Sequence, residues 1–441
     1  MEITVIGLGY VGLVNAVYLA SLGHKIIGYD IDKNKISLLK QGVATLEEPN
    51  LQEMLTESYQ NIRFTSNHKD AIRQAKIIFI CVDTPENKDG SLNLKNYYDV
   101  LNTIVSDSVC EQTIVIRSTV PIGTNKLTKK YLEERCKHKF MVISFPEFLS
   151  QGKAVENLVH PYRLVLGVNG VHALNMAKQL GQAFLIKKAT VMITSPENAE
   201  LIKYASNCFL AMKISFINDI AKFCELVNAD VDKVAKGMAL DPRIGDSFLG
   251  AGIGYGGSCF PKDTNGLYWL SNNYLQPMEL IKSTIKINES MVDFFLNKIY
   301  SRFRSVSNLR CAVLGVSFKG GSEDVRNSQA IPIVKALLDR NARITIYDPL
   351  AMDNFHALFS RHQHIKYVDY PIDALKNSDF AIILNDSKEF KALKANDFIN
   401  TMRKPVIFDG RNLFKVEDMH GTEYYSIGRS PLKKNNRGKR S

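Results

Sequence analysis

A glycine-rich motif near the N-terminus constrains the fold more than any other feature of this chain. Residues 7–12 read GLGYVG and stand between a short β-rich run, residues 2–7, and a helical pattern over residues 15–22. A second strand pattern, residues 25–29, follows and ends at Asp30. Strand, glycine turn, helix and strand in this order predict one right-handed βαβ unit of a parallel sheet.

This βαβ unit carries the signature of a dinucleotide-binding site. Gly7 permits the tight turn, Gly9 lets the backbone approach a pyrophosphate, and Gly12 lets the helix pack closely on the strand. Amides at the helix N-terminus then face the phosphates. Asp30 can accept hydrogen bonds from both ribose hydroxyls, which favours NAD over NADP, although Lys35 nearby could tolerate a 2′-phosphate.

The same alternation continues along the first part of the chain. Helical patterns separate further apolar strands at residues 76–82, 113–117, 140–145, 164–168 and 189–193. Alternation of this kind indicates a parallel sheet covered by helices on both faces. We expect an NAD-binding Rossmann domain over residues 1–194.

A helical region follows. Ser195, Pro196 and Glu197 form an N-cap, a first-turn proline and an acidic first turn, and the chain from Glu197 to Val227 contains no Gly or Pro. A helix this long predicts a crossing between domains and packing on a partner. A second helical stretch closes this central dimerisation domain, which we expect over residues 195–304.

The last third of the chain repeats the first pattern. A strand over residues 310–316 leads to a glycine-containing loop, a helix and a second strand that ends in Tyr347-Asp348, echoing Tyr29-Asp30. The fold class is therefore α/β, with two Rossmann-like doubly wound parallel sheets joined by a helical region with a long central helix. The second sheet should occupy residues 305–429, and the basic residues 430–441 should form a disordered tail.

The charge balance constrains the partners. Lys and Arg number 56 against 45 Asp and Glu, a formal net charge of +11. Such an excess predicts an anionic partner: nucleic acid, an acidic membrane surface or phosphorylated small molecules.

The absence of several sequence features restricts the cellular compartment in which we expect the protein. No apolar run approaches the roughly 18 residues of a membrane span, and the N-terminus lacks the basic leader of a signal peptide. The seven cysteines are scattered without CxxC spacing, which argues against a disulfide or zinc framework. We expect a soluble cytoplasmic protein without a bound metal.

One cysteine stands in a motif with chemistry. Residues 252–264 read GIGYGGSCFPKDT, which places Cys259 in a glycine-rich turn with Lys262 three residues further on. A lysine lowers the pKa of a nearby thiol, and the thiolate is the nucleophile. A buried hydrophobic role is the alternative for a cysteine, but this setting predicts a functional one.

Three other groups of residues are weaker indications of a functional site when each is considered alone. Residues 117–119 close a strand, where sheet enzymes place ligand-contacting groups. Glu147 also follows a strand and could be a base or a helix cap. Lys203 and Asn207 are four residues apart and share one helix face, although such a pair is commonly solvated surface.

The order of these pieces resembles the UDP-glucose/GDP-mannose dehydrogenase family over nearly the whole chain except the tail. The resemblance rests on GLGYVG, the strand end at Thr119, PEFL at 146–149, the helix over 197–207, GYGGSCFPKDT and DGRN at 409–412. It implies a four-electron, NAD-dependent oxidation of a nucleotide sugar at C6, from alcohol to acid, with two NADH formed per sugar. Members acting on N-acetylated sugars usually differ around the cysteine, so UDP-glucose is the implied substrate and UDP-glucuronate the product.

The resemblance also implies roles for individual residues. Cys259 would trap the aldehyde as a thiohemiacetal, and hydride loss would give a thioester that water hydrolyses. Lys203 and Asn207 would hold the developing alkoxide or oxyanion. Asp263, through a water stabilised by Thr119, would assist the first proton removal.

Glu147 would act as the base for thioester hydrolysis. Further NAD contacts implied by the resemblance are Val11, Thr84, Thr119, Gln151, Lys262 and Arg326. Substrate contacts would come from Glu147, Phe148, Leu149, Lys203, Asn207, Phe248, Leu249, Gly250, Ala251, Gly252, Gly256, Lys319 and Arg411. Arg243 would enter the partner subunit's site, which implies a homodimer built on the long helix.

One position departs from the family pattern. Many members have a second glutamate four residues after the PEFL glutamate, and this chain has Gln151. NAD affinity or the pH profile should differ as a result, without loss of activity.

Other functions predict other behaviour. The same chemistry on GDP-mannose or UDP-galactose is the nearest alternative. A nucleic-acid- or membrane-surface-binding protein recruited by basic charge would bind DNA or anionic vesicles with a salt-sensitive affinity. A non-catalytic NAD-binding scaffold is a further alternative, but it would not explain the presence of Cys259 together with Lys203 and Asn207.

Overall fold

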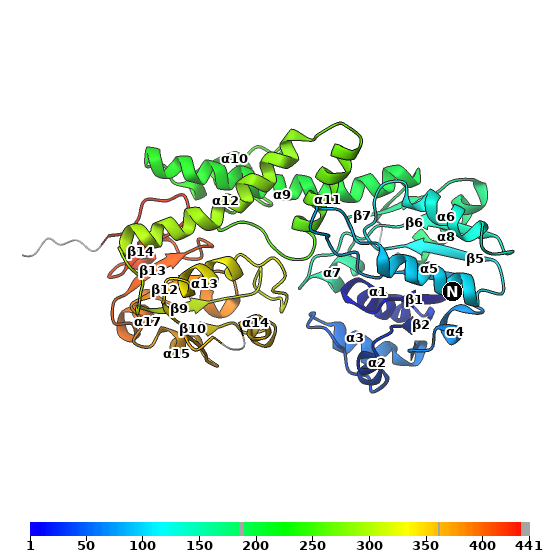
Figure 1. Ribbon diagram of the computed structural model, residues 1–441, viewed down its shortest axis with the longest axis horizontal. Helices are drawn as coiled ribbons and strands as arrows, with labels where there is room; N and C mark the ends of the chain where they lie inside the picture. Colours follow the sequence, from blue (N-terminus) through cyan, green and yellow to red (C-terminus); the bar gives the residue numbers. More distant parts are fainter. Residues whose placement is uncertain (185–188, 360–361, 434–441) are drawn as a thin grey trace, which may run out of the picture. The chain divides into compact units, whose positions relative to one another are not determined.

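Two β-sheets organise the computed structural model, which describes residues 1–184, 189–359 and 362–433 (Figure 1). The chain divides into two units. Unit 1 comprises Met1–Ser206 with Trp269–Tyr274, and unit 2 comprises Asn207–Tyr268 with the described residues from Leu275 onward. The division falls inside two helices, and the domain limits expected from the sequence remain predictions.

Unit 1 contains an eight-stranded sheet in the order β3-β2-β1-β4-β5-β6-β7-β8. Its strands are β1 (Glu2–Ile6), β2 (Lys25–Tyr29), β3 (Ile62–Thr65), β4 (Ile77–Ile80), β5 (Gln112–Ile116), β6 (Phe140–Ser144), β7 (Arg163–Gly167) and β8 (Thr190–Thr194). The first six strands follow the doubly wound order 3-2-1-4-5-6, which places a switch point between β1 and β4. The predicted α/β architecture is confirmed for this sheet.

One pair of strands differs from the all-parallel expectation. β6 and β7 pair antiparallel, through Ser144 and Gly167, whereas the other neighbours in the sheet are parallel. An apolar run reads the same in either chain direction, so hydrophobic patterning cannot reveal strand polarity.

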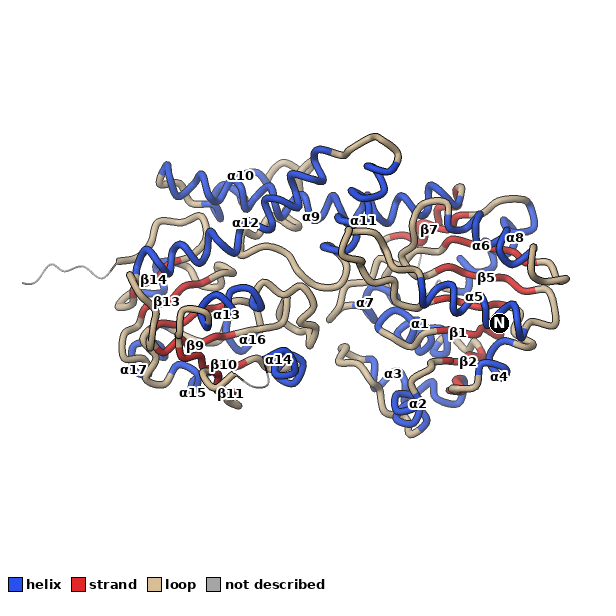
Figure 2. The backbone as a smooth tube through the Cα atoms, in the orientation of Figure 1, coloured by secondary structure: helices blue, strands red, loops and turns tan. Residues whose placement is uncertain are grey.

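Helices cover both faces of this sheet (Figure 2). They are α1 (Tyr10–Ser21), α2 (Lys33–Lys40), α3 (Leu51–Ser58), η1 (Tyr59–Asn61), α4 (His68–Ile72), α5 (Lys95–Asp107), α6 (Thr124–Glu133), α7 (Ala154–Val159) and α8 (Val171–Ala183). Alternate strand residues separate two cores: Phe79 packs with the α1, α7 and α8 side, and Ile80 with the α4, α5 and α6 side. The two cores therefore follow from the alternation of side chains between the two faces along each buried strand.

Unit 2 contains a six-stranded parallel sheet in the order β11-β10-β9-β12-β13-β14. Its strands are β9 (Arg310–Leu314), β10 (Arg343–Tyr347), β11 (Ile365–Tyr367), β12 (Phe380–Ile383), β13 (Val406–Asp409) and β14 (Glu423–Tyr425). Renumbered within the unit this is again 3-2-1-4-5-6, so the predicted repeat of one topology is confirmed.

The helices of unit 2 cover both faces of its sheet. They are α10 (Val231–Ala239), α12 (Glu279–Arg302), α13 (Ala330–Leu338), α14 (Met352–Phe359), α15 (Pro371–Leu375), α16 (Lys388–Lys391), α17 (Ala395–Thr401) and η2 (Val416–Met419). Phe295 of α12 and Ile333 of α13 pack in the core on one face, while Phe390 and Phe398 pack on the other.

Two helices contribute to both units: α9 (Pro196–Val227) and α11 (Phe260–Asn273). The predicted long helix is confirmed as α9, with 32 residues. The Ser195 hydroxyl accepts a hydrogen bond from the Asn198 amide at 3.3 Å, the geometry of an N-cap.

The two glycine turns that follow β1 and β9 are alike in detail. In unit 1 the Leu8 amide donates to Asp30 Oδ2 at 2.8 Å. In unit 2 the Val316 amide donates to Asp348 Oδ2 at 2.8 Å. The Tyr-Asp pair that recurs in the sequence therefore reflects the same turn geometry in both sheets.

The predicted C-terminal tail is described only at its start. Leu432 exchanges two backbone hydrogen bonds of 2.9 Å with Tyr424, so the chain still pairs with the sheet where the sequence predicts disorder. The rest of the predicted tail, 434–441, lies outside the described residues.

Two further features bear on the sequence expectations. Among the described residues, no helix is both long and apolar enough to cross a membrane. The seven cysteines are all present as free thiols.

Candidate functional site

The carboxyl ends of β1 and β2 place the glycine motif and Asp30, both predicted to bind the cofactor, at one edge of the unit 1 sheet. A Cβ on Gly12 would lie 1.8 Å from the Gly7 carbonyl oxygen, so this position accepts only glycine. A Cβ on Gly9 would meet nothing nearer than a side-chain oxygen at 4.0 Å. Helix α1 begins there without a side-chain cap. An open approach to uncapped helix amides fits a bound diphosphate.

Asp30 stands at the end of the neighbouring strand. Its carboxylate accepts from the Leu8 and Asp32 amides and forms an ion pair with Lys35 at 3.1 Å. A carboxylate at this point suits a ribose diol. The lysine considered for a 2′-phosphate is therefore engaged by Asp30 itself.

The corresponding turn in unit 2 is filled by protein. A Cβ on Gly315 would lie 2.5 Å from the side chain of the fully buried Asn385. Asp348 accepts hydrogen bonds from Asn385 and from the amides of Leu350 and Ala351. The geometry thus favours unit 1 as the dinucleotide site.

A buried ion pair lies at the end of β6. Lys203 Nζ donates to Glu147 Oε1 at 2.6 Å, and the Leu149 amide donates to Glu147 Oε2 at 2.6 Å. Lys203 is 3% exposed, so the interpretation of Lys203 and Asn207 as a solvated surface pair is wrong. Burial alone would raise the pKa of Glu147, but the Lys203 ammonium and the Leu149 amide hold it below its ordinary value. Glu147 is therefore an oriented carboxylate.

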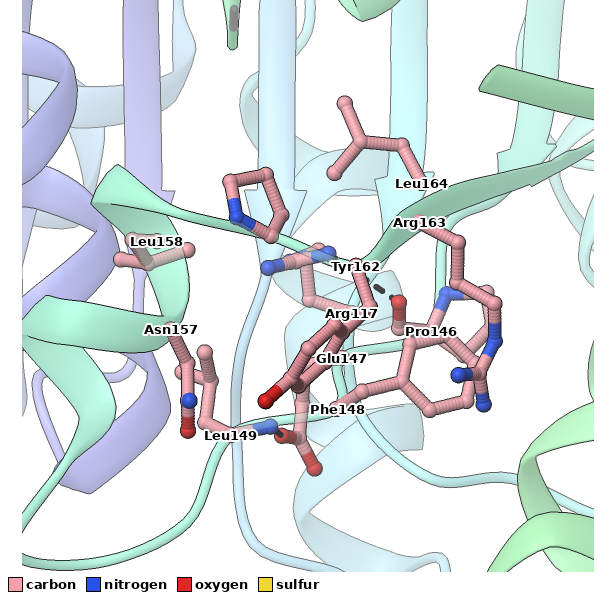
Figure 3. Close-up of a pocket in the computed structure, with 11 residues that line it drawn as sticks. Arg117, Pro146, Glu147, Phe148, Leu149, Asn157, Leu158, Tyr162, Arg163 and Leu164 are labelled. Atoms are coloured by element: carbon pink, nitrogen blue, oxygen red, sulfur yellow. Dashed lines mark hydrogen bonds between the residues drawn. The ribbon is translucent and has the colours of Figure 1, made fainter. Parts of the chain in front are cut away.

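Figure 3 shows the pocket beside this ion pair. Its lining includes Arg117, Glu147 and the predicted substrate residues Phe148 and Leu149. The guanidinium of Arg163 lies 4.2 Å from the centre of the Phe148 ring, a cation–π contact that fixes the ring.

A smaller cavity of unit 1 contains Thr119, Glu200 and Lys203. The Thr84 hydroxyl donates to the Thr119 carbonyl at 2.7 Å, which joins two predicted cofactor contacts. The structure thus places Thr119 and Lys203, predicted catalytic residues, around one cavity.

In unit 2, Cys259 directly precedes helix α11, and its carbonyl accepts from the Asp263 amide at 2.8 Å. A helix N-terminus stabilises a thiolate. Asp263 is buried, and its two oxygens accept from Asn207 and Lys262, each at 2.6 Å. Lys262, expected to reach NAD, is paired here with Asp263.

The glycine-rich loop before Cys259 is fixed against the second sheet. Arg411 donates to the Gly254 carbonyl at 2.9 Å and to the Phe318 carbonyl at 3.0 Å. A Cβ on Gly256 would lie 2.3 Å from the Asn327 carbonyl oxygen, so the close approach requires glycine. Arg411, expected to reach the substrate, therefore ties the cysteine loop to the residues beside Lys319.

Exposure differs among the residues of the 248–252 stretch, in which Gly252 is buried next to Ala251. Leu249 and Ala251 are buried, Phe248 is exposed with a left-handed φ of 65°, and Gly250 is exposed. The Gly252 amide donates to Asn218 Oδ1 at 2.8 Å.

Other predicted contacts are not drawn into these clusters. Arg243 has an exposed side chain held by Asp241, and Arg326 has an exposed side chain held by Asp324. Val11 and Gln151 are partly buried in unit 1. Their ligand roles remain predictions.

Sequence reasoning missed two carboxylates that support these clusters. Glu200 accepts from the Gly123 and Asn125 amides at 2.6 and 2.9 Å, capping α6. Glu48 accepts from the Tyr10 hydroxyl and from the Ala154 amide. Glu200 falls one turn before Lys203, a helical spacing that could have revealed it. Glu48 has no local signal, because its partners are distant in sequence.

Comparison with protein families matches the chain in three consecutive parts. Residues 1–210 match the NAD binding domain of the UDP-glucose/GDP-mannose dehydrogenase family, residues 197–290 its central domain, and residues 312–416 its UDP binding domain.

Individual relatives span nearly the whole chain. UDP-glucose 6-dehydrogenase YwqF of Bacillus subtilis (strain 168) is 40% identical over 438 residues, covering 98% of both chains. UDP-glucose 6-dehydrogenase of Rhizobium meliloti (strain 1021) is 37% identical over 438 residues, covering 97% of this chain and all of the relative.

Solved structures share the fold. A UDP-glucose dehydrogenase from the hyperthermophilic archaeon Pyrobaculum islandicum superposes with a TM-score of 0.90 at 32% identity, covering 97% of this chain and 98% of that one. A UDP-D-ManNAc dehydrogenase from Pyrococcus horikoshii gives a TM-score of 0.86 at 29% identity, with 97% and 99% covered.

Proposed function

The chain belongs to the UDP-glucose/GDP-mannose dehydrogenase family and has that family's NAD binding domain, and from this premise we propose that it oxidises UDP-glucose at C6 to UDP-glucuronate. The full-length relatives named UDP-glucose 6-dehydrogenase support this substrate. When bound, NAD accepts the hydride in each of two oxidations. The remaining chemistry falls to side chains of this chain.

One observation carries the proposal: Cys259 stands at the N-terminus of α11, one turn before a buried Asp263 held by Asn207 and Lys262. A nucleotide-binding protein that only holds its ligand needs no such group. A thiolate adds to the C6 aldehyde and forms a thiohemiacetal, whose hydride leaves to give a thioester. Water then attacks the thioester carbonyl, the acid forms, and the thiolate is regenerated.

The acid–base roles follow from the two ion-paired carboxylates. Asp263, oriented by Asn207 and Lys262, accepts the C6 hydroxyl proton in the first oxidation, through a water stabilised by Thr119. Lys203 and Asn207 direct a cation and an amide donor toward the alkoxide and the later oxyanion. Glu147 accepts the proton from the water that hydrolyses the thioester.

The remaining ligand contacts are part of the same proposal. The GLGYVG turn and Asp30 hold NAD, with further contacts from Val11, Lys35, Thr84, Thr119, Gln151, Lys262 and Arg326. The UDP-sugar is held by Phe148, Leu149, the 248–252 stretch, Gly256, Lys319 and Arg411.

We also propose a homodimer built on α9. Phe209, Phe216 and Phe223 recur at seven-residue intervals and are 57%, 48% and 60% exposed. Large aromatic side chains at this spacing form one apolar stripe, which water disfavours and a second helix can cover. The exposed Arg243 would reach the partner's site.

The decisive experiment counts NADH per sugar. With limiting UDP-glucose and excess NAD, the wild-type chain should form two NADH for each sugar consumed. Cys259→Ser should stop acid production while NAD binding is retained. A ratio of one, or unchanged acid production by C259S, would contradict the thioester route.

Substrate choice needs its own comparison. Rates measured side by side with UDP-glucose, UDP-galactose and GDP-mannose should favour UDP-glucose. A higher kcat/KM for either competitor would keep the chemistry and change the substrate.

A further inference from the structure

Arg117 is a buried cation that forms no ion pair with any of the described residues. It follows β5 and is 3% exposed, yet its guanidinium donates to neutral acceptors: Asn15 Oδ1 at 2.8 Å and the carbonyls of Phe145 and Pro146 at 3.0 and 3.2 Å. Its Nε is buried without a hydrogen-bond partner. Among the described residues, no carboxylate lies within ion-pair distance of the guanidinium. Burying a charge in this way is costly, so the position calls for an explanation.

The surroundings hold this guanidinium rigidly. It lies 4.3 Å from the centre of the Phe145 ring and 5.5 Å from that of Phe184. Asn15, which accepts one of its hydrogen bonds, also donates to the Val11 carbonyl in α1. Arg117 therefore connects the helix of the dinucleotide motif to the backbone immediately before Glu147.

Glu147 is the carboxylate on which this charge acts. Arg117, Pro146 and Glu147 line one pocket (Figure 3). The ionisable groups around Glu147 are Lys203, which contacts it directly, Arg117, and the neutral Tyr10 and Cys81. Two cations thus act on one carboxylate: Lys203 through a direct hydrogen bond, and Arg117 from the wall of the same pocket.

Lys203 has a second task in the proposed reaction, because the oxyanion of the hydrolysis step also needs a cation. When the ammonium turns to that oxygen, Glu147 loses its direct partner. A buried carboxylate left alone would take up a proton and could no longer act as a base.

Resting on the proposed role of Glu147, we propose that Arg117 is a positioning residue. It fixes the Pro146–Glu147 backbone and supplies a permanent positive charge that keeps Glu147 ionised while Lys203 serves the reacting oxygen.

Two variants separate charge from shape. Arg117→Met removes the positive charge and keeps an unbranched side chain. Arg117→Lys keeps the positive charge but lacks the planar guanidinium and its several N–H donors. In R117M the acidic limb of the pH profile of kcat should move to higher pH by about one unit, because Glu147 is then protonated more easily. Intact-mass analysis at neutral pH should show a thioester adduct on Cys259 accumulating in this variant. R117K should restore the limb and remove the adduct, even if kcat stays lower.

Asn15→Ala is the matched control, since it removes one hydrogen bond to Arg117 and leaves the charge in place. Its acidic limb should stay at the wild-type pH. R117M with a wild-type limb and no adduct, whatever its thermal stability, would overturn the proposal, and so would R117K behaving like R117M.

The variants distinguish a failure of the Arg117 proposal from a failure of the proposed role of Glu147 as a base. Glu147→Gln should abolish the acidic limb if Glu147 is the base. If E147Q removes the limb and R117M leaves it unchanged, only the Arg117 proposal fails. If E147Q leaves the limb unchanged, the proposed role of Glu147 fails first.

Discussion

At the scale of single residues, the three motif glycines have separable tasks. Gly12 is required by packing, because any side chain would collide with the Gly7 carbonyl. Gly9 is not required by packing, since the space beside it is open. Its absence of a side chain matters to a ligand rather than to the fold.

This difference predicts opposite phenotypes for two alanine substitutions. Gly12→Ala should cost unit 1 about 3 kcal/mol of stability, because a backbone oxygen cannot move away cheaply. Gly9→Ala should leave the melting temperature unchanged and weaken NAD binding about tenfold or more, since the methyl group occupies the path of the pyrophosphate. Calorimetry with and without NAD measures both. Equal melting temperatures for the two variants would contradict the separation.

Two buried carboxylates of unit 1 have pKa shifts of opposite sign. The pKa of Glu147 is lowered, because Lys203 outweighs burial, and the pKa of Glu200 is raised by burial. Glu147 therefore stabilises the fold above its unfolded pKa, and this contribution is lost as pH falls through its folded pKa. The contribution of Glu200 is present below its unfolded pKa and is lost as pH rises through its folded pKa.

Melting curves across pH should show this contrast. The stability advantage of the wild type over E147Q should shrink as pH falls below the ordinary glutamate value of 4.5. The advantage over Glu200→Gln should shrink as pH rises above it. Parallel trends for the two variants would contradict the assigned shifts.

At the scale of elements, α9 carries two distinct sets of side chains on one helix. Glu200, Lys203 and Asn207 follow one another at helical spacing and are buried, whereas Phe209, Phe216 and Phe223 are exposed. A helix of ordinary length would not offer enough turns for both sets.

Phe216→Glu tests the exposed stripe, because it places a charge at the centre of the proposed interface. We expect the dimer dissociation constant to rise about 30-fold or more, as for the loss of an interface hot spot. Leu275→Lys is the control, since Leu275 is 89% exposed and lies outside α9. Sedimentation velocity should show monomer for F216E and dimer for L275K. A monomeric wild type, or F216E sedimenting as a dimer, would contradict the interface.

At the scale of the whole molecule, one topology serves two purposes. The first six strands of the unit 1 sheet and the whole unit 2 sheet share the order 3-2-1-4-5-6, and both sheets place an aspartate after the second strand. In unit 1 the glycine turn is open to a ligand, whereas in unit 2 Asn385 fills it. The two aspartates should therefore respond differently to substitution.

Asp30→Asn should weaken NAD binding about tenfold, because an amide replaces an acceptor at the ribose. Asp348→Asn should leave NAD affinity unchanged and lower the stability of unit 2 by about 1–3 kcal/mol, since an amide nitrogen would then face the Val316 and Ser317 donors. Isothermal titration and thermal unfolding measure the two effects. Loss of NAD affinity in D348N would contradict this division.

Although the short strands β3, β11 and β14 were not predicted, the sequence by itself determined most of the strands, the two repeated sheets and the long helix. Local patterns suffice for these, since strand alternation, helix caps and glycine turns are written in neighbouring residues. Cys259 and the GLGYVG motif were found for the same reason, because each is a contiguous run with its own chemistry.

Tertiary structure decided what patterns cannot encode. The antiparallel β6–β7 pair, the burial of Lys203 against Glu147 and the burial of Arg117 against Asn15 all depend on contacts between distant segments. Charge and hydrophobicity in a sequence identify which groups are available. Only the packing of the chain determines which of them lose water and must find partners.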